Sequence, residues 1–326
     1  MENTPREQFI KALRCLPIEG RVPHFELVFF PVMEAIGKVH PKYRNYYQWK
    51  QMSRKDQKLQ LEDIADTYIQ TAEKYHHSAI HVHPRNMSED AAIELLEVIR
   101  ERSGDKYFLM VHGDPTPAIP DGDTMMDFSV QMYEEPEVIH EQTKRSMEHY
   151  ETFAHRLAQQ KGLLDGFILC SDYCFNQNPF FSPDQFDEFI GPYLTEIIRL
   201  YHQLGFYAIK HTDGNIMPIL DRLVACGPDA LHSLDPQGGV SLKAVKDVCR
   251  GKVCLIGNVN CGLLQSGSRE DIICDVRRAL REGMPGYGYI FSTSNCIFAG
   301  LELERYELMN SIWLQEGVYE QEGVER

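Results

Sequence analysis

The chain contains 326 residues, with a hydrophobic content of 43%, a charged content of 25% and a formal net charge of −15. These values are ordinary for a globular protein, but the negative charge is unsuited to a nucleic-acid partner, which attracts a basic face. No apolar run approaches the roughly 18 residues of a membrane span, and the polar N-terminus is unlike a signal peptide. The nine cysteines include no C-x-x-C pair, which indicates reduced thiols in a cytoplasmic protein.

The N-terminal part of the chain begins with a helix and continues into a strand. Thr4, Pro5 and Glu7 form a capping box with proline at the first helical position. The apolar segment 24–30 is typical of a strand. Residues 31–54 then combine aromatic and basic side chains, and a loop of this length is uncommon unless it has a function. Two interpretations stay open for it, an aromatic lid over a site and a packed surface excursion.

Seven further apolar segments alternate with helical patterns along the rest of the chain. With 24–30, they make eight expected strands, the others being 78–83, 107–112, 166–172, 206–213, 230–235, 253–258 and 289–295. This alternation predicts a (β/α)₈ barrel, formed as a single domain by residues 1–326. An open doubly wound sheet is the alternative, but its G-x-G-x-x-G phosphate fingerprint does not follow the first strand.

Polar side chains gather at the C-terminal ends of the expected strands, where barrel enzymes place their active sites. Five histidines together with acids and a thiol are more than the fold itself requires. This set comprises Glu26, His81, His83, His112, Asp172, His211, Asp213, His232, Asp235, Asn258, Asn295 and Cys296.

Two pairs within this set have the spacing of metal ligands. His81 and His83 share one face of a strand, either as a metal pair or as a strand end bonded to the backbone. His211 and Asp213 also share a face, and with Cys296 they would offer nitrogen, oxygen and sulfur to zinc. Cys296 alone would equally suit core filling. Glu26 is costly to bury unpaired, so we expect a ligand, a base or the partner of a histidine.

Four motifs in the chain resemble the uroporphyrinogen decarboxylase superfamily. The motifs are Ser182-Pro-Asp-Gln-Phe, His211-Thr-Asp-Gly-Asn, Leu255-Ile-Gly-Asn-Val and Phe291-Ser-Thr-Ser-Asn, and the likeness extends to residues 20–23 and 113–116. The resemblance implies a (β/α)₈ barrel, and it implies either the haem-pathway decarboxylase or a cobalamin-dependent methyltransferase with zinc.

Departures from the family pattern separate these two activities. The decarboxylase carries arginines just after its first strand and an aspartate after its second. Here the first position holds Val28-Phe-Phe-Pro-Val, and the second holds His81-Val-His83. The methyltransferase branch has His-x-Cys after the fifth strand and another cysteine after the eighth. His211 and Cys296 match this pattern, while Asp213 replaces the middle cysteine.

The resemblance therefore implies a methyltransferase that moves a methyl group between a small methylated substrate and a corrinoid on a partner protein. Rival hypotheses are a metal-free decarboxylase of another acid and a non-catalytic barrel that binds a tetrapyrrole or a corrinoid protein. Monomer and homodimer both stay open. The implied zinc ligands are His211, Asp213 and Cys296. The implied catalytic or proton-relaying groups are Glu26, His81, His83 and His112. Substrate binding is expected from Tyr173, Asp172, His232 and Asn258.

Overall fold

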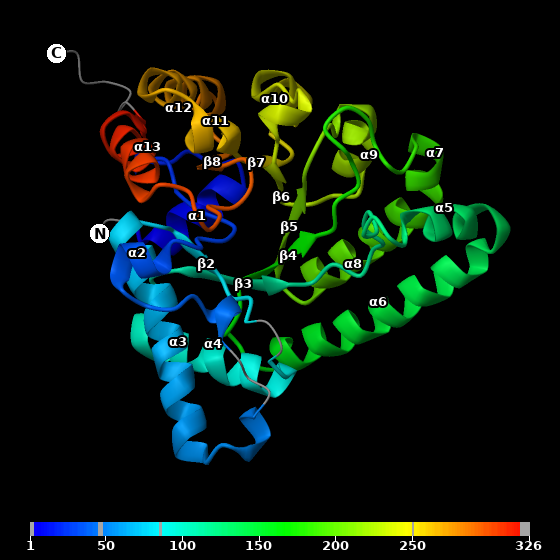
Figure 1. Ribbon diagram of the computed structural model, residues 1–326, viewed down its shortest axis with the longest axis horizontal. Coiled ribbons are helices and arrows are strands. Elements are labelled where there is room, and N and C mark those ends of the chain that lie inside the picture. The colour runs from blue at the N-terminus through cyan, green and yellow to red at the C-terminus, as the bar shows by residue number, and fades with distance from the viewer. Residues whose placement is uncertain (1–2, 45–47, 85–86, 250, 320–326) are drawn as a thin grey trace.

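The computed structural model describes residues 3–44, 48–84, 87–249 and 251–319. A parallel sheet of seven strands, in the order β2-β3-β4-β5-β6-β7-β8, curves through its centre with helices outside (Figure 1). This arrangement confirms the predicted α/β barrel class. The strands are β2 (Ala79–His81), β3 (Phe108–His112), β4 (Gly166–Cys170), β5 (Tyr207–Thr212), β6 (Ala230–Ser233), β7 (Cys254–Val259) and β8 (Tyr289–Thr293).

The first expected strand, 24–30, takes the eighth position of the ring without forming a regular ladder. On one side it makes only isolated parallel bridges to Phe291 and Ile297. On the other side, the amide of Ser78 donates to the carbonyl of His24 at 2.7 Å. Polar side chains replace the missing ladder bonds, since Glu26 Oε2 accepts from the amide of Thr293 and His81 Nδ1 bonds the carbonyl of Leu27.

Helices cover the outside of the barrel. The capping box predicted at Thr4 is confirmed, and Ser182 forms a second one. A short pair, β1 (Gly20–Arg21) and β9 (Val318–Tyr319), joins the two ends of the chain. Among the helices of the described residues, none combines the length and apolarity that crossing a membrane requires. The principal helices are α1 (Pro5–Leu13), α3 (Arg54–Tyr75), α4 (Glu89–Ser103), α5 (Met125–Glu134), α6 (Pro136–Ala158), α8 (Gly191–Gln203), α9 (Leu220–Ala225), α10 (Leu242–Cys249), α11 (Cys261–Ser266), α12 (Arg269–Gly283) and α13 (Leu303–Glu316).

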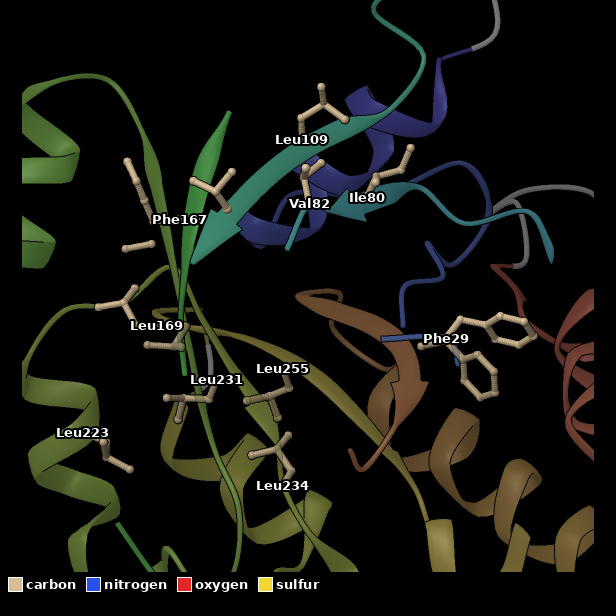
Figure 2. Packing of buried hydrophobic residues seen from close by; sticks show 14 of the residues in the cluster. Phe29, Ile80, Val82, Leu109, Phe167, Leu169, Leu223, Leu231, Leu234 and Leu255 are labelled. Atoms are coloured by element: carbon tan, nitrogen blue, oxygen red, sulfur yellow. The ribbon is translucent and has the colours of Figure 1, made fainter. Parts of the chain in front are cut away.

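Alternate residues of each strand face either the helices or the barrel interior. Figure 2 shows the outward set, in which Ile80, Leu109 and Phe167 pack in one apolar cluster. The intervening residues fill the interior as a second apolar cluster, and α1 covers its N-terminal mouth, where Phe9 stacks on Phe108 with ring centroids 4.7 Å apart. On six strands, the inward-facing residue that lies two positions after the last apolar residue of this cluster is polar or a cysteine. We call these residues the inner polar layer, which comprises His81, His112, Cys170, His211, His232 and Ser292.

The segment expected as a lid or a surface excursion packs against the end of β2. It contains α2 (Val32–Ile36) and two short 3₁₀ turns, Pro41–Tyr43 and Trp49–Gln51. The ring of His40 lies 5.6 Å from that of His83, measured between centroids. Residues 45–47, with two of the predicted aromatic side chains, lie outside the described residues. The part that is described therefore forms a packed wall near the histidines of β2.

A buried ion pair fixes the outward side of β5. Lys210 Nζ lies 2.7 Å from Asp114 Oδ2, and both side chains are fully buried. Lys210 also donates to the carbonyl of Ser171 at 2.9 Å, and it lies 4.1 Å from the ring centroid of Tyr173. Burial alone would raise the pKa of Asp114, but the charge of Lys210 outweighs it and the pKa is lowered. The pair thus ties the loop after β3 to the ends of β4 and β5.

We predict that Lys210→Ala lowers the free energy of unfolding by about 3–5 kcal/mol, because it leaves the Asp114 carboxylate buried without a partner. The double variant K210M/D114L removes both charges and should recover much of this loss. Denaturant unfolding monitored by circular dichroism measures both values. A double variant no more stable than the single variant would show that the charges are not the cause.

Candidate functional site

The ends of β4 and β5 bring Asp172, His211 and Asp213 together. One ligand atom from each lies within 4.8 Å of the others. His211 Nε2 is 3.8 Å from Asp172 Oδ1 and 3.9 Å from Asp213 Oδ1. The register explains the meeting, because Cys170 pairs with His211 and the acids follow two residues later on each strand. The amide of Asp213 also donates to Asp172 Oδ1 at 2.9 Å. We call these three residues the carboxylate–histidine group.

His232 of β6 lies directly behind this group. Its Nδ1 is 2.7 Å from His211 Nδ1, so one of the two nitrogens must carry the shared proton. Burial lowers the pKa of His232 well below its ordinary value, and the ring is therefore neutral. If the Nδ1–H of His211 donates this hydrogen bond to His232, the unprotonated Nε2 of His211 faces the two carboxylates. His232 is 1% exposed, and its contact fixes the orientation of the His211 ring. Its expected part in substrate binding stays a prediction.

Asp213 has an oxygen that calls for a further partner. Its Oδ2 accepts from the Asn295 side-chain amide, but its buried Oδ1 makes no hydrogen bond among the described residues. Burial and the charge of Asp172 raise the pKa of Asp213. A buried carboxylate oxygen without a partner is costly, and a cation would remove that cost. One imidazole nitrogen and carboxylate oxygens are suitable ligands for a divalent ion such as zinc, so the group fits a metal.

Cys296, the expected sulfur ligand, is not a member of the carboxylate–histidine group. The preceding residue, Asn295, contacts Asp213 in its place. Burial, followed by the charges of Asp213 and Glu26, raises the pKa of the Cys296 thiol to about 11. Asp172, which we expected to bind substrate, is instead the third residue whose side chain could hold an ion beside His211 and Asp213. The reason is proximity, since β4 is the neighbour of β5 whereas β8 is separated from it by two strands.

A second group lines a small cavity of about 40 Å³ beside the packed wall, formed by Glu26, His40, His81 and His83 among others. The rings of His81 and His83 stack with centroids 4.6 Å apart. His81 Nδ1 lies 3.1 Å from the carbonyl of Leu27, while its buried Nε2 has no hydrogen-bond partner among the described residues. Such a cavity has room for one or a few water molecules.

Electrostatic effects connect the two groups. Burial lowers the pKa of His81 well below its ordinary value, and the charges of His83, His112 and His211 act in the same direction. Burial also lowers the pKa of His112. His81 and His112 are therefore neutral acceptors or donors near neutral pH.

Glu26 forms a fully buried pair with His24. Glu26 Oε1 lies 3.1 Å from His24 Nε2, and His24 Nδ1 lies 3.1 Å from the carbonyl of Tyr75. A carbonyl only accepts, so the proton of His24 is on Nδ1 and Nε2 is an acceptor. Burial lowers the pKa of His24 to about 3 and raises that of Glu26 to about 8. The pair is therefore neutral at pH 7, with the Glu26 carboxyl donating to His24.

Two further residues expected to bind substrate have structural contacts. Tyr173 is fully buried, and its hydroxyl lies 2.6 Å from Thr116 Oγ1. Asn258 donates to the carbonyl of Leu234 at 2.7 Å and accepts from Arg278 of α12 at 3.1 Å. These hydrogen bonds hold both side chains within the barrel wall, and their expected part in substrate binding stays a prediction.

Comparison with known proteins agrees with this architecture of a barrel whose candidate site is at the strand ends. Residues 120–312, more than half of the chain, match the family described as Uroporphyrinogen decarboxylase (URO-D). The chain belongs to the URO-D family. Curated proteins gave no match.

Solved structures share the fold at low sequence identity. The chain is similar to a methyltransferase from Methanosarcina mazei, with 16% identity and a TM-score of 0.73 over 96% of this chain and 99% of that chain. It is also similar to a B12-independent methionine synthase from Shewanella sp. W3-18-1, with 13% identity and a TM-score of 0.49 over 81% of this chain and 89% of that chain. The first likeness supports the barrel along nearly the whole chain.

The raised pKa of Glu26 predicts that stability falls as pH rises. The carboxyl of the unfolded chain loses its proton near its ordinary pKa of 4.5, whereas the folded protein keeps it to about pH 8. The folded state binds the additional proton in this interval, so the free energy of unfolding decreases by up to about 1.4 kcal/mol per pH unit. Buried histidines such as His24, with its lowered pKa, act in the opposite sense, but only below about pH 6.5.

In unfolding titrations between pH 6.5 and 8, the difference between the wild type and Glu26→Gln isolates Glu26, because other groups with a raised pKa, such as His202, are common to both proteins. We expect Glu26→Gln, which keeps the shape but not the proton, to have a flatter dependence than the wild type in this window. Parallel slopes for the two proteins would mean that Glu26 is already ionised in the folded state.

Proposed function

We propose that this protein is a metal-assisted methyltransferase, which moves a methyl group between a small methylated compound and a corrinoid carried by a separate protein. The observation that carries the proposal is the carboxylate–histidine group, with its unsatisfied Asp213 oxygen, at the C-terminal end of a URO-D family barrel. The similar structure from Methanosarcina mazei is a methyltransferase, which supports the same choice.

In this proposal, Asp172, His211 and Asp213 hold one divalent ion, and zinc suits their nitrogen and oxygen donors. The ion supplies Lewis acidity toward the heteroatom that carries the methyl group. His232 keeps the His211 ring oriented through the 2.7 Å contact between their Nδ1 atoms. Asn295 holds Asp213 through its Oδ2 and leaves Oδ1 for the ion.

The neutral histidines near the group suit the same chemistry. When a methyl group leaves a heteroatom, the electron pair of the broken bond stays on that heteroatom, which then needs a positive charge or a proton. His81 offers an unprotonated Nε2 in the cavity wall, and Glu26 carries a proton at pH 7. We therefore assign Glu26 to proton supply, and His81 to accepting a hydrogen bond from the substrate or from water.

The charges of the carboxylate–histidine group disfavour the decarboxylation of a substrate that carries several carboxylates. A substrate with several carboxylates would have to approach Asp172 and Asp213, in a chain with a net charge of −15. Like charges in a partly buried site repel strongly. A bound cation reverses this repulsion locally, and a small substrate of low charge avoids it.

Metal content tests the proposed ligands. We expect wild-type protein, purified without a chelating tag, to contain about one zinc ion per chain, and His211→Ala and Asp213→Asn to lose it. Cys296→Ser should keep the ion, because the thiol lies outside the group. Asp235→Asn is a matched control, since this carboxylate, at the end of β6, accepts from the Gln237 amide. Mass spectrometry of the metal measures all five proteins.

Turnover tests the reaction itself. Wild-type protein should convert reduced cobalamin to methylcobalamin, detected by its absorption spectrum, with at least one compound in a panel of O-, N- and S-methyl donors. Chelation should abolish this conversion, and added zinc should restore it. Activity that survives complete removal of metal would favour the metal-free decarboxylase. Corrinoid-protein binding without turnover would favour the non-catalytic barrel.

A further inference from the structure

Four buried polar side chains form a continuous chain of contacts through the wall of the barrel. His77 Nε2 lies 3.0 Å from the Tyr306 hydroxyl, which lies 3.4 Å from His24 Nε2. His24 Nε2 is in turn 3.1 Å from Glu26 Oε1. These residues come from the start of β2, from α13 and from the segment 24–30, and none is more than 5% exposed.

The two ends of this chain border different spaces. His77 lines a groove of about 410 Å³ near the N-terminal ends of the strands, together with His76, Lys106 and Trp313. Glu26 lines the small cavity that also contains His81 and His83. His77 borders this cavity too, so it stands between the groove and the inner space. The contacts therefore link the groove to the residue that we assign to proton supply.

Packing alone does not account for these four residues. Apolar rings surround them, since Trp313 and Phe291 lie 4.7 and 5.5 Å from the His24 ring, measured between centroids. Burying four polar groups among such rings costs free energy unless each group is hydrogen-bonded. Every member here is bonded to the next, and each can both accept and donate a proton in one of its states.

We propose that His77, Tyr306, His24 and Glu26 form a proton relay that recharges Glu26 from the groove. Its use in catalysis rests on the proposed function, whereas its existence does not. Each transfer breaks one N–H or O–H bond and forms another. A proton from groove water binds His77, whose Nε2–H passes to the Tyr306 oxygen as the Tyr306 hydroxyl proton passes to His24 Nε2. The proton then moves from His24 to the Glu26 carboxylate. His77 is left with its proton on Nδ1, so the starting state returns only after the Tyr306 hydroxyl rotates and the His77 ring turns over or exchanges this proton with water to regain its Nε2–H.

The surroundings of Glu26 favour this direction of transfer. Thr293 of β8 and His24 are its bonded neighbours, and His24 is its one ion-pair partner among the described residues. Cys261 of α11 and Cys296 after β8 also face its charge, but burial raises the pKa of both thiols, so neither is charged at neutral pH. A Glu26 carboxylate in this environment has no cation to hold it, and it takes up a proton readily.

Infrared spectroscopy after a pH jump tests the relay without any substrate. The carbonyl stretch of protonated Glu26 is assigned by its absence in Glu26→Gln, and its return is followed after a jump from about pH 9 to about pH 6. We expect Tyr306→Phe and His77→Gln to slow this return about tenfold or more, with the same final amplitude. Tyr75→Phe is the matched control, because the Tyr75 hydroxyl bonds Glu307 and lies outside the relay.

Wild-type rates in both relay variants would overturn the proposal. If Tyr306→Phe does not fold, the rate in His77→Gln alone decides the question. A slowed return in a protein that never methylates cobalamin would keep the relay and remove the proposed function. Normal methyl transfer, together with a wild-type return rate in both relay variants, would keep the proposed function and remove the relay.

Discussion

The candidate site depends above all on the parallel register of β4, β5 and β6. Pairing of Cys170 with His211 and of His211 with His232 places three inward side chains at one level of the barrel. The apolar interior ends just below this level. Two residues later, Asp172 and Asp213 emerge side by side, while His232 is fixed behind His211. A slip of one residue in either pairing would turn these side chains toward the helices.

The site combines two electrostatic environments that differ sharply. At the ends of β4 and β5, two carboxylates and an imidazole converge with one buried oxygen unsatisfied, which favours a cation. Along β2 and the segment 24–30, burial keeps His24 and His81 neutral and Glu26 protonated. If the first environment holds a cation, the second, uncharged and proton-carrying environment would complement it in the cleavage of a bond to a heteroatom, because such cleavage needs both a positive charge and a proton.

The sequence predicted the fold, and the position of the site at the strand ends, better than it predicted which side chains contact one another. Strand alternation identified the barrel, and the two-residue spacing placed His211 and Asp213 on one side of β5. Asp172 joins His211 because β4 is the neighbour of β5, whereas two strands lie between β5 and β8, and the family pattern that pointed to Cys296 does not reflect this order. The hydrogen bonds of Tyr173 and Asn258 could not be predicted, because their partners, Thr116 and Arg278, lie in distant elements. Lys210, a charge inside an apolar strand, was a signal that pointed to a buried partner.

The central claim is that one nitrogen and carboxylate oxygens, without sulfur, hold the ion. X-ray absorption at the zinc edge of the zinc-loaded wild-type protein tests it most directly, because zinc–sulfur bonds of about 2.3 Å are readily separated from zinc–nitrogen and zinc–oxygen bonds of about 2.0–2.2 Å. The account predicts a shell of nitrogen and oxygen alone, with scattering from one imidazole ring. A sulfur neighbour would contradict it, and would place Cys296 where we place Asp172.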